Sequence, residues 1–178
     1  MEIIKTKNNG FLISSKAIDV AIDSPDDKSD VSLNSAPQPD APKSDSIVFD
    51  SQGEYEVKSC MIDAIPVIDG KCGFSLITEG VRAAYLPEDV KEVLSDDQVE
   101  AFSTVDILIV PVIGEKAEIT TKIINQIEPK IIIPHSYKEE QLKLLAAEFG
   151  SDYESVSKFK ISKKELSETE QQRLVVLN

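Results

Sequence analysis

The sequence is poor in histidine and cysteine, the residues that build most zinc sites. Only one of its 178 residues, His135, is a histidine. A single imidazole excludes zinc sites made of several histidines, and it leaves a Ser-His-Asp triad only one base. The two cysteines, Cys60 and Cys72, are too few for a disulfide framework or a cysteine-rich zinc site. We interpret both as thiols of a reducing compartment.

Positive charge and long apolar runs are also scarce. There are 19 Lys and Arg residues against 32 Asp and Glu residues, which gives a net charge of −13. This balance argues against sequence-independent binding to nucleic acid or to an anionic membrane. The longest apolar runs, at residues 107–113 and 131–134, are far shorter than the roughly 20 residues of a membrane helix. Residues 1–7 lack a secretory apolar core, so we expect a cytoplasmic protein.

The first half of the chain is typical of short strands. Residues 11–13 and 17–22 flank a turn-like segment and predict a hairpin. Glu79 and Gly80 predict a second hairpin turn, of two residues. Further strands are predicted at residues 47–49, 55–57, 61–67, 74–78 and 81–86.

A long polar stretch interrupts this half. Residues 24–45 contain four prolines among Ser, Asp, Lys and Asn, and only residues 31–33 have strand character. We predict a flexible loop here, which either closes over a site or binds a partner.

The second half alternates strands with helices. Ser95 followed by two acidic residues and Gln98 predicts a helix start with a capping box. The pattern then predicts strands at residues 105–112 and 130–134 and helices at 117–127 and 139–149. Alternation of this kind favours βαβ units with parallel strands. Residues 159–161 and 174–177 are predicted as edge strands, and residues 163–172 as a solvated helix or turn.

Several strings in this order resemble the metallo-β-lactamase fold family, in particular its compact branch of zinc-dependent hydrolases of the β-lactamase fold. They are Gly-Glu-Tyr-Glu-Val at 53–57, Leu-Ser-Asp-Asp-Gln-Val-Glu at 94–100, Val-Asp-Ile-Leu-Ile-Val-Pro-Val at 105–112, and Glu-Pro-Lys-Ile-Ile-Ile-Pro at 128–134 followed by Tyr137. The resemblance covers nearly the whole chain. It implies an α/β fold, a four-layered αββα sandwich, formed as a single domain over residues 1–178.

Active members of that family hold one or two zinc ions through a His-x-His-x-Asp-His signature and further ligands on loops at one edge of the sandwich. In the register that the resemblance implies, Ala36, Gln38 and Ala41 replace the histidines of the signature, and only Asp40 is retained. An early Gly-His-Ser turn of the family is matched by Lys-Asn-Asn at residues 7–9, which has no histidine.

The remaining ligand positions are altered as well. One family histidine falls at or near Asp69, and the bridging aspartate falls near Glu88. The last metal histidine, which precedes a tyrosine, is matched by Ser136, and His135 is displaced by one place. On a strand or tight loop, such a displacement points the side chain the other way. Because alanine cannot bind a metal and glutamine binds zinc poorly, we expect the zinc site to be lost.

Two functional hypotheses remain open. The first is a non-catalytic protein, a pseudoenzyme without a cofactor, that acts by binding or assembly. The second is a metal-dependent hydrolase with a rebuilt, oxygen-rich site, for which the remnant candidates are Asp40, Asp69, Glu88 and His135. Zinc is expected only under this second hypothesis, and His135 otherwise has a structural role.

Partners are predicted only in outline. The edge strand expected at residues 174–177 needs a cover, and a second copy of the chain can provide it, so we predict a homodimer. Pairing with an intact homologue that keeps the full histidine signature is the other possibility.

Overall fold

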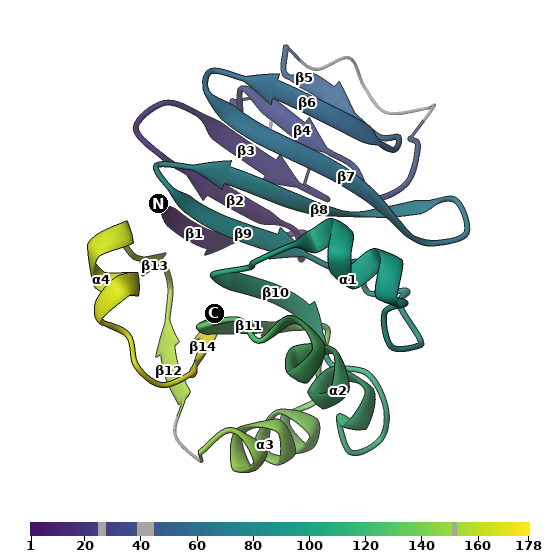
Figure 1. Ribbon diagram of the computed structural model, residues 1–178, viewed down its shortest axis with the longest axis vertical. Helices are drawn as coiled ribbons and strands as arrows, with labels where there is room; N and C mark the ends of the chain where they lie inside the picture. The colour runs from purple at the N-terminus through teal and green to yellow at the C-terminus, as the bar shows by residue number, and fades with distance from the viewer. Residues whose placement is uncertain (25–27, 39–44, 151–152) are drawn as a thin grey trace.

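Two β-sheets packed face to face form the centre of the molecule (Figure 1). The computed structural model describes residues 1–24, 28–38, 45–150 and 153–178. Within these residues, the first sheet has six strands in the order β13-β1-β2-β3-β4-β5. They are β1 (Glu2–Lys5), β2 (Phe11–Ser14), β3 (Asp19–Ile22), β4 (Val31–Leu33), β5 (Ile47–Phe49) and β13 (Phe159–Lys160).

The second sheet has eight described strands in the order β12-β14-β11-β10-β9-β8-β7-β6. They are β6 (Gly53–Val57), β7 (Cys60–Ile68), β8 (Lys71–Thr78), β9 (Val81–Tyr85), β10 (Ile107–Pro111), β11 (Ile131–His135), β12 (Tyr153–Val156) and β14 (Arg173–Leu177). Strands β9, β10, β11 and β14 run parallel to one another, which confirms the predicted parallel units.

Helices cover the outer face of the second sheet (Figure 1). They are α1 (Asp96–Phe102), α2 (Glu118–Ile127) and α3 (Glu139–Glu148). A short helix, α4 (Lys163–Glu168), lies beside β13, and its Leu166 packs in the core between the sheets. The α/β sandwich that the sequence predicts is therefore confirmed.

The strand at residues 107–111 shows why this sheet is covered on both faces. Ile107 and Ile109 point into the core between the sheets, whereas Leu108 and Val110 pack against the helices. Successive side chains of a strand point to opposite faces, so a run without polar residues must be buried on both.

The predicted local signals are confirmed at several points. Ser95 caps α1, and its side chain and that of Gln98 form the capping box. The turn at Glu79 and Gly80 joins β8 to β9, with Thr78 opposite Val81 and positive φ at both turn residues. This is the conformation of a tight two-residue hairpin.

One predicted edge strand is wrong. Residues 174–177 belong to β14, which lies between β11 and β12 inside the sheet. The cover is β12 of the same chain, Tyr153–Val156, which was not predicted because its side chains are mostly exposed and lack an apolar pattern. Strand β1 was not predicted either. The other predicted edge strand, at residues 159–161, is confirmed as β13, Phe159–Lys160, at the edge of the first sheet.

The predicted loop at 24–45 is described only in part. Its predicted strand is confirmed as β4, Val31–Leu33, which is fully buried and parallel to β3 and β5. Residues 25–27 and 39–44 lie outside the described residues. The flexibility of this loop stays a prediction.

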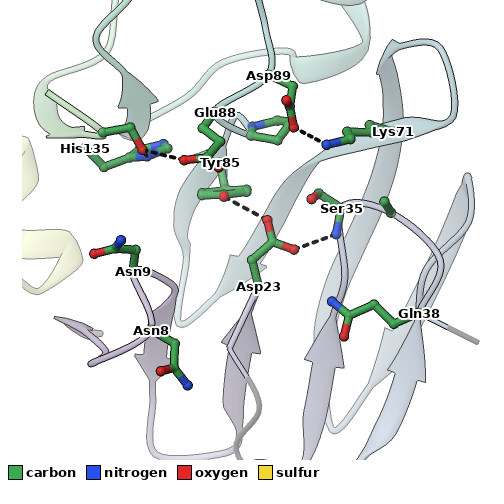
Figure 2. Close-up of a pocket in the computed structure, with 13 residues that line it drawn as sticks. Asn8, Asn9, Asp23, Ser35, Gln38, Lys71, Tyr85, Glu88, Asp89 and His135 are labelled. Atoms are coloured by element: carbon green, nitrogen blue, oxygen red, sulfur yellow. Dashed lines mark hydrogen bonds and ion pairs between the residues drawn. The ribbon is translucent and has the colours of Figure 1, made fainter. Parts of the chain in front are cut away.

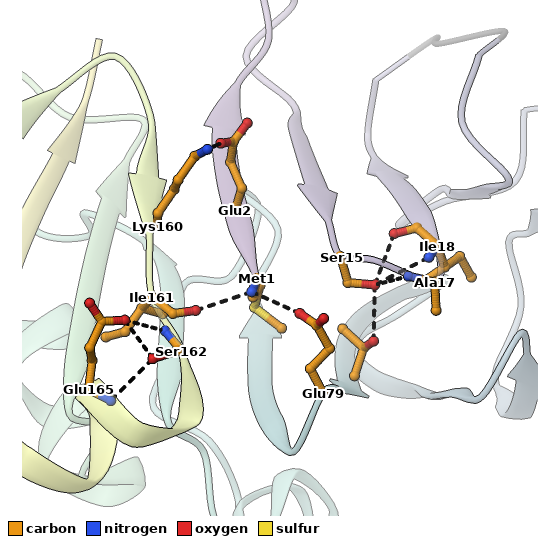
Figure 3. Close-up of polar contacts among 11 residues, drawn as sticks. Met1, Glu2, Ser15, Ala17, Ile18, Glu79, Lys160, Ile161, Ser162 and Glu165 are labelled. Atoms are coloured by element: carbon orange, nitrogen blue, oxygen red, sulfur yellow. Dashed lines mark hydrogen bonds and ion pairs between the residues drawn. The ribbon is translucent and has the colours of Figure 1, made fainter.

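Polar contacts tie the two sheets together at one end of the sandwich (Figure 3). The amino group of Met1 donates to the Glu79 carboxylate at 3.0 Å and to the Ile161 carbonyl at 3.1 Å. The Thr78 hydroxyl donates to Ser15 Oγ at 3.2 Å. Among the described helices, none is both long and apolar enough to cross a membrane.

Candidate functional site

A polar cavity of about 320 Å³ opens at the other end of the sandwich, where loops from both sheets meet (Figure 2). Strands β1 and β3 of the first sheet end here, as do β9 and β11 of the second. Parallel strands bring the residues that follow them to one edge, which is where α/β folds commonly form sites. Asp23 and Ser35 come from the first sheet, and Tyr85 and His135 from the second.

A partly buried hydrogen-bond chain crosses the cavity floor between the two sheets. The Tyr85 hydroxyl donates to Asp23 Oδ2 at 2.8 Å, and the Ser35 backbone N–H donates to Asp23 Oδ1 at 2.7 Å. Burial, helped by the Asp23 carboxylate, raises the pKa of Tyr85 far above its usual value. Tyr85 is therefore a permanent donor, and both oxygens of Asp23 are engaged.

His135 lies next to this chain and is held through both ring nitrogens. Nε2 is 2.9 Å from the Leu86 carbonyl oxygen, and Nδ1 is 3.0 Å from Ser136 Oγ. A carbonyl only accepts, so Nε2 carries the proton of the neutral ring. Nδ1 is therefore an acceptor, and the single proton of the Ser136 hydroxyl is donated either to Nδ1 or to Glu88 Oε2, which lies 3.1 Å from Ser136 Oγ. Burial, with a smaller effect of the Lys5 charge, lowers the pKa of His135 to about 4.

A cation is part of the cavity wall. The Lys71 ammonium forms an ion pair with Asp89, which follows β9 in the same loop as Glu88 (Figure 2). Lys71 begins β8, which is antiparallel to β9, so its position at this edge follows from the hairpin.

The predicted remnant candidates are only partly brought together. Glu88 and His135 both line the cavity. Asp69 lies in the turn between β7 and β8 and is not among the residues that line this cavity. Asp40 lies outside the described residues.

The expected direction of the His135 side chain is also wrong. Ile131, Ile133 and His135 alternate along β11 and share the face between the sheets, so the ring points toward the cavity. Ser136 reaches the same cavity because its backbone turns to a φ of 51°. The one-residue displacement therefore does not exclude either side chain.

The other substituted positions gather around the cavity. Asn8, Ala36 and Gln38, which the resemblance places at or next to histidine positions of the family, all line it together with Ser136. Ala41 lies outside the described residues. The implied register thus brings these four positions to one site.

Four of the lining residues that the sequence did not predict have ionisable side chains: Asp23, Lys71, Tyr85 and Asp89. Asp23, Tyr85 and Asp89 stand at or just after the ends of predicted strands, and this position was the available signal. Lys71 carries no such signal, because its place depends on the packing of one hairpin.

The described residues do not fit a zinc ion. No group of three His, Cys, Asp or Glu side chains within the described residues can hold a metal. His135 donates Nε2–H to a carbonyl, and Tyr85 is a donor. Both cysteines are free and buried, as interpreted from the sequence, and burial raises the pKa of Cys60 to about 11. Zinc needs about three anionic or imidazole ligands that converge with open lone pairs.

Comparison with solved structures supports the sandwich fold. A Thermotoga maritima protein assigned to the Zn-dependent hydrolases of the metallo-β-lactamase superfamily is 24% identical, with a TM-score of 0.81, and the match covers 99% of this chain and 97% of that one. The metallo-β-lactamase fold protein YhfI from Bacillus subtilis is 10% identical, with a TM-score of 0.60 over 99% of this chain and 96% of that one.

A third match, a protein from Parabacteroides distasonis assigned as a metal-dependent hydrolase, is 17% identical, with a TM-score of 0.63 over 83% and 87% of the two chains. No curated protein matches the sequence. The sequence profile of the β-lactamase superfamily domain matches residues 4–136, a span that includes the strands and loops which build most of the cavity. This chain belongs to the β-lactamase superfamily domain family.

Proposed function

We propose that this chain is a metallo-β-lactamase-fold protein without zinc chemistry, which acts by binding at its polar cavity or by assembly. The observation that carries the proposal is that polar groups of the cavity already have hydrogen-bond or ion-pair partners within the protein. Asp23, His135 and Asp89, which could bind a metal, are each paired with another group of the protein. Groups that are already paired lose those partners on binding a metal, which costs free energy.

Electrostatics supports the same proposal. The Lys71 ammonium stands at the cavity wall and balances the Asp89 carboxylate. A divalent cation in the cavity is repelled by this ammonium and finds one carboxylate fewer to bind. Ala36 and Gln38 add no strong zinc ligand on the opposite side.

The alternative is a metal-dependent hydrolase with a rebuilt site. One observation favours it: Glu88 and His135, two of its predicted residues, share the cavity and are linked through Ser136. The names of two structural neighbours, both assigned to metal-dependent hydrolases, agree with it. The position of Asp69 outside the cavity weakens it.

Elemental analysis tests the proposal directly. The untagged protein is purified without chelators, and a second sample is loaded with zinc and desalted. We expect well below one equivalent of zinc in both samples, and no hydrolysis of ester, lactam or phosphodiester substrates.

A control separates a specific site from adventitious zinc. A Glu88→Gln, His135→Gln double variant is carried through the same procedure. One equivalent of zinc in the natural protein, lost in the double variant and accompanied by turnover, would establish the rebuilt hydrolase and end the proposal.

A further inference from the structure

The cavity walls differ in which polar groups are still free to bind a molecule. On the side of the second sheet, Lys71 is paired with Asp89, and His135 is held by Leu86 and Ser136. On the side of the first sheet, Asn8, Asn9 and Gln38 line the cavity (Figure 2), and their side chains have no hydrogen bond among the described residues. Free recognition groups are therefore mainly carboxamides.

Glu88 adds a charged group with spare capacity. It is exposed, and among the described residues its one hydrogen-bond partner is the Ser136 hydroxyl, 3.1 Å from Oε2. A carboxylate has about four acceptor positions. Glu88 can therefore accept further bonds from hydroxyl or ammonium groups of a bound molecule.

The charges of the lining groups exclude one class of molecule. Three carboxylates, of Asp23, Glu88 and Asp89, line the cavity against one ammonium, of Lys71. That ammonium is already paired, and the buried His135 ring is neutral because burial lowers its pKa to about 4. An anion would meet repulsion from Glu88 and no unpaired cation among the described residues that line the cavity.

We propose that the cavity binds an uncharged or cationic polyhydroxylated molecule of about one hexose in size and rejects the corresponding anions. This rests on the proposed function, since a resident metal dication would reverse the preference. Carboxamides donate and accept together, so they match neighbouring hydroxyl groups, which do the same. A volume of about 320 Å³ is at the lower end of small-molecule pockets.

Three sugars that share a pyranose ring provide the test: glucose, glucosamine and glucuronate. Binding is measured by titration calorimetry at low salt and slightly acidic pH, where glucosamine carries an ammonium group. We expect glucosamine to bind about tenfold more tightly than glucose, because one favourable charge contact near a surface is worth about that factor. Glucuronate is expected to bind at least about tenfold more weakly than glucose.

Two variants test whether the charge of Glu88 causes the tighter binding of glucosamine. In Glu88→Gln, the amide oxygen can still accept from Ser136 but the charge is gone, so glucosamine binding is expected to fall to the level of glucose. Glu92→Gln is the matched control, because Glu92 lies in the same loop but lines a different groove. It should leave the order of the three sugars unchanged.

The outcomes that would overturn the ligand class differ from the outcome that would refute the proposed function. Glucuronate binding as tightly as glucose, an unchanged order in Glu88→Gln, or no binding of any sugar by folded protein would each overturn the ligand class. Zinc content is measured on the same samples: stoichiometric zinc would refute the proposed function, whatever the order of the sugars.

Discussion

The ring of His135 packs beside two aromatic rings that also contact each other, with centroids 5.6 Å from Phe11 and 5.4 Å from Tyr85. It is 2% exposed, so the charged form would lose its hydration with no carboxylate bonded to the ring. The pKa of His135 is accordingly lowered from 6.5 to about 4. A histidine that is neutral in the folded chain and charged in the unfolded chain makes stability depend on pH.

The direction of that dependence follows from proton uptake. Between pH 6.5 and pH 4 the unfolded chain binds a proton at this histidine and the folded chain does not, so acidification favours unfolding. We expect the natural protein to lose about 2 kcal/mol more unfolding free energy between pH 7 and pH 4.5 than His135→Gln does. Urea titrations at both pH values measure it. Equal losses in the two proteins would show that His135 is not buried in its neutral form.

Some residues of the candidate site could be predicted from the sequence, and others could not. The substitution of histidines by Ala36 and Gln38 is visible in the sequence, and both residues line the cavity. The roles of Asp23 and Tyr85 could not be predicted, because their hydrogen bond joins residues 62 positions apart on different sheets. The orientation of His135 was mispredicted because Ser136 has a positive φ, which places two successive side chains in one cavity.

At the scale of elements, the edges of the sheets decide how copies of the chain can meet. The homodimer was predicted from residues 174–177, but β12 of the same chain covers that strand. Strand β5 ends the first sheet, and its Ile47 and Val48 are 49% and 47% exposed. A short edge strand with exposed apolar side chains favours pairing with another strand.

The homodimer therefore remains a prediction, now placed at β5. Light scattering on the purified protein is expected to give twice the mass of one chain. Val48→Lys should return the monomer, because a lysine at an edge opposes strand pairing. Val93→Lys, at another exposed valine away from β5, is the control and should stay dimeric. A monomeric natural protein would contradict the prediction, and a search for an intact homologue as partner would follow.

Elements with strong local signals were predictable, and those that depend on the rest of the fold were not. The capping box of α1 and the turn at Glu79 and Gly80 are set by neighbouring residues. Strand β12 is exposed at three of its four residues, and it forms because it pairs with the edge of β14. Its existence follows from the pairing and not from its own sequence.

At the scale of the whole molecule, the bond between Tyr85 and Asp23 connects the two sheets across the cavity floor. Removing the hydroxyl leaves one oxygen of a half-buried carboxylate without its donor. Such a loss costs about 1–3 kcal/mol of unfolding free energy. We expect Tyr85→Phe to be destabilised by that amount in urea titrations.

The matched control for this substitution is Tyr137→Phe. Among the described residues, the Tyr137 hydroxyl has no hydrogen bond, so its loss should change the unfolding free energy by less than about 0.5 kcal/mol. Equal effects of the two substitutions would show that the contact between the sheets contributes nothing beyond ordinary packing.

The solitary histidine has a practical consequence for spectroscopy. Since His135 is the only imidazole of the chain and stands at the cavity wall, its ring protons give one pair of resonances in a nuclear magnetic resonance spectrum without isotope labels. The His135 ring protons lie close to the rings of Phe11 and Tyr85, and the ring currents of these two residues make the proton chemical shifts sensitive to small displacements. A library of small molecules can thus be screened against the unmodified protein by following a single, already assigned reporter.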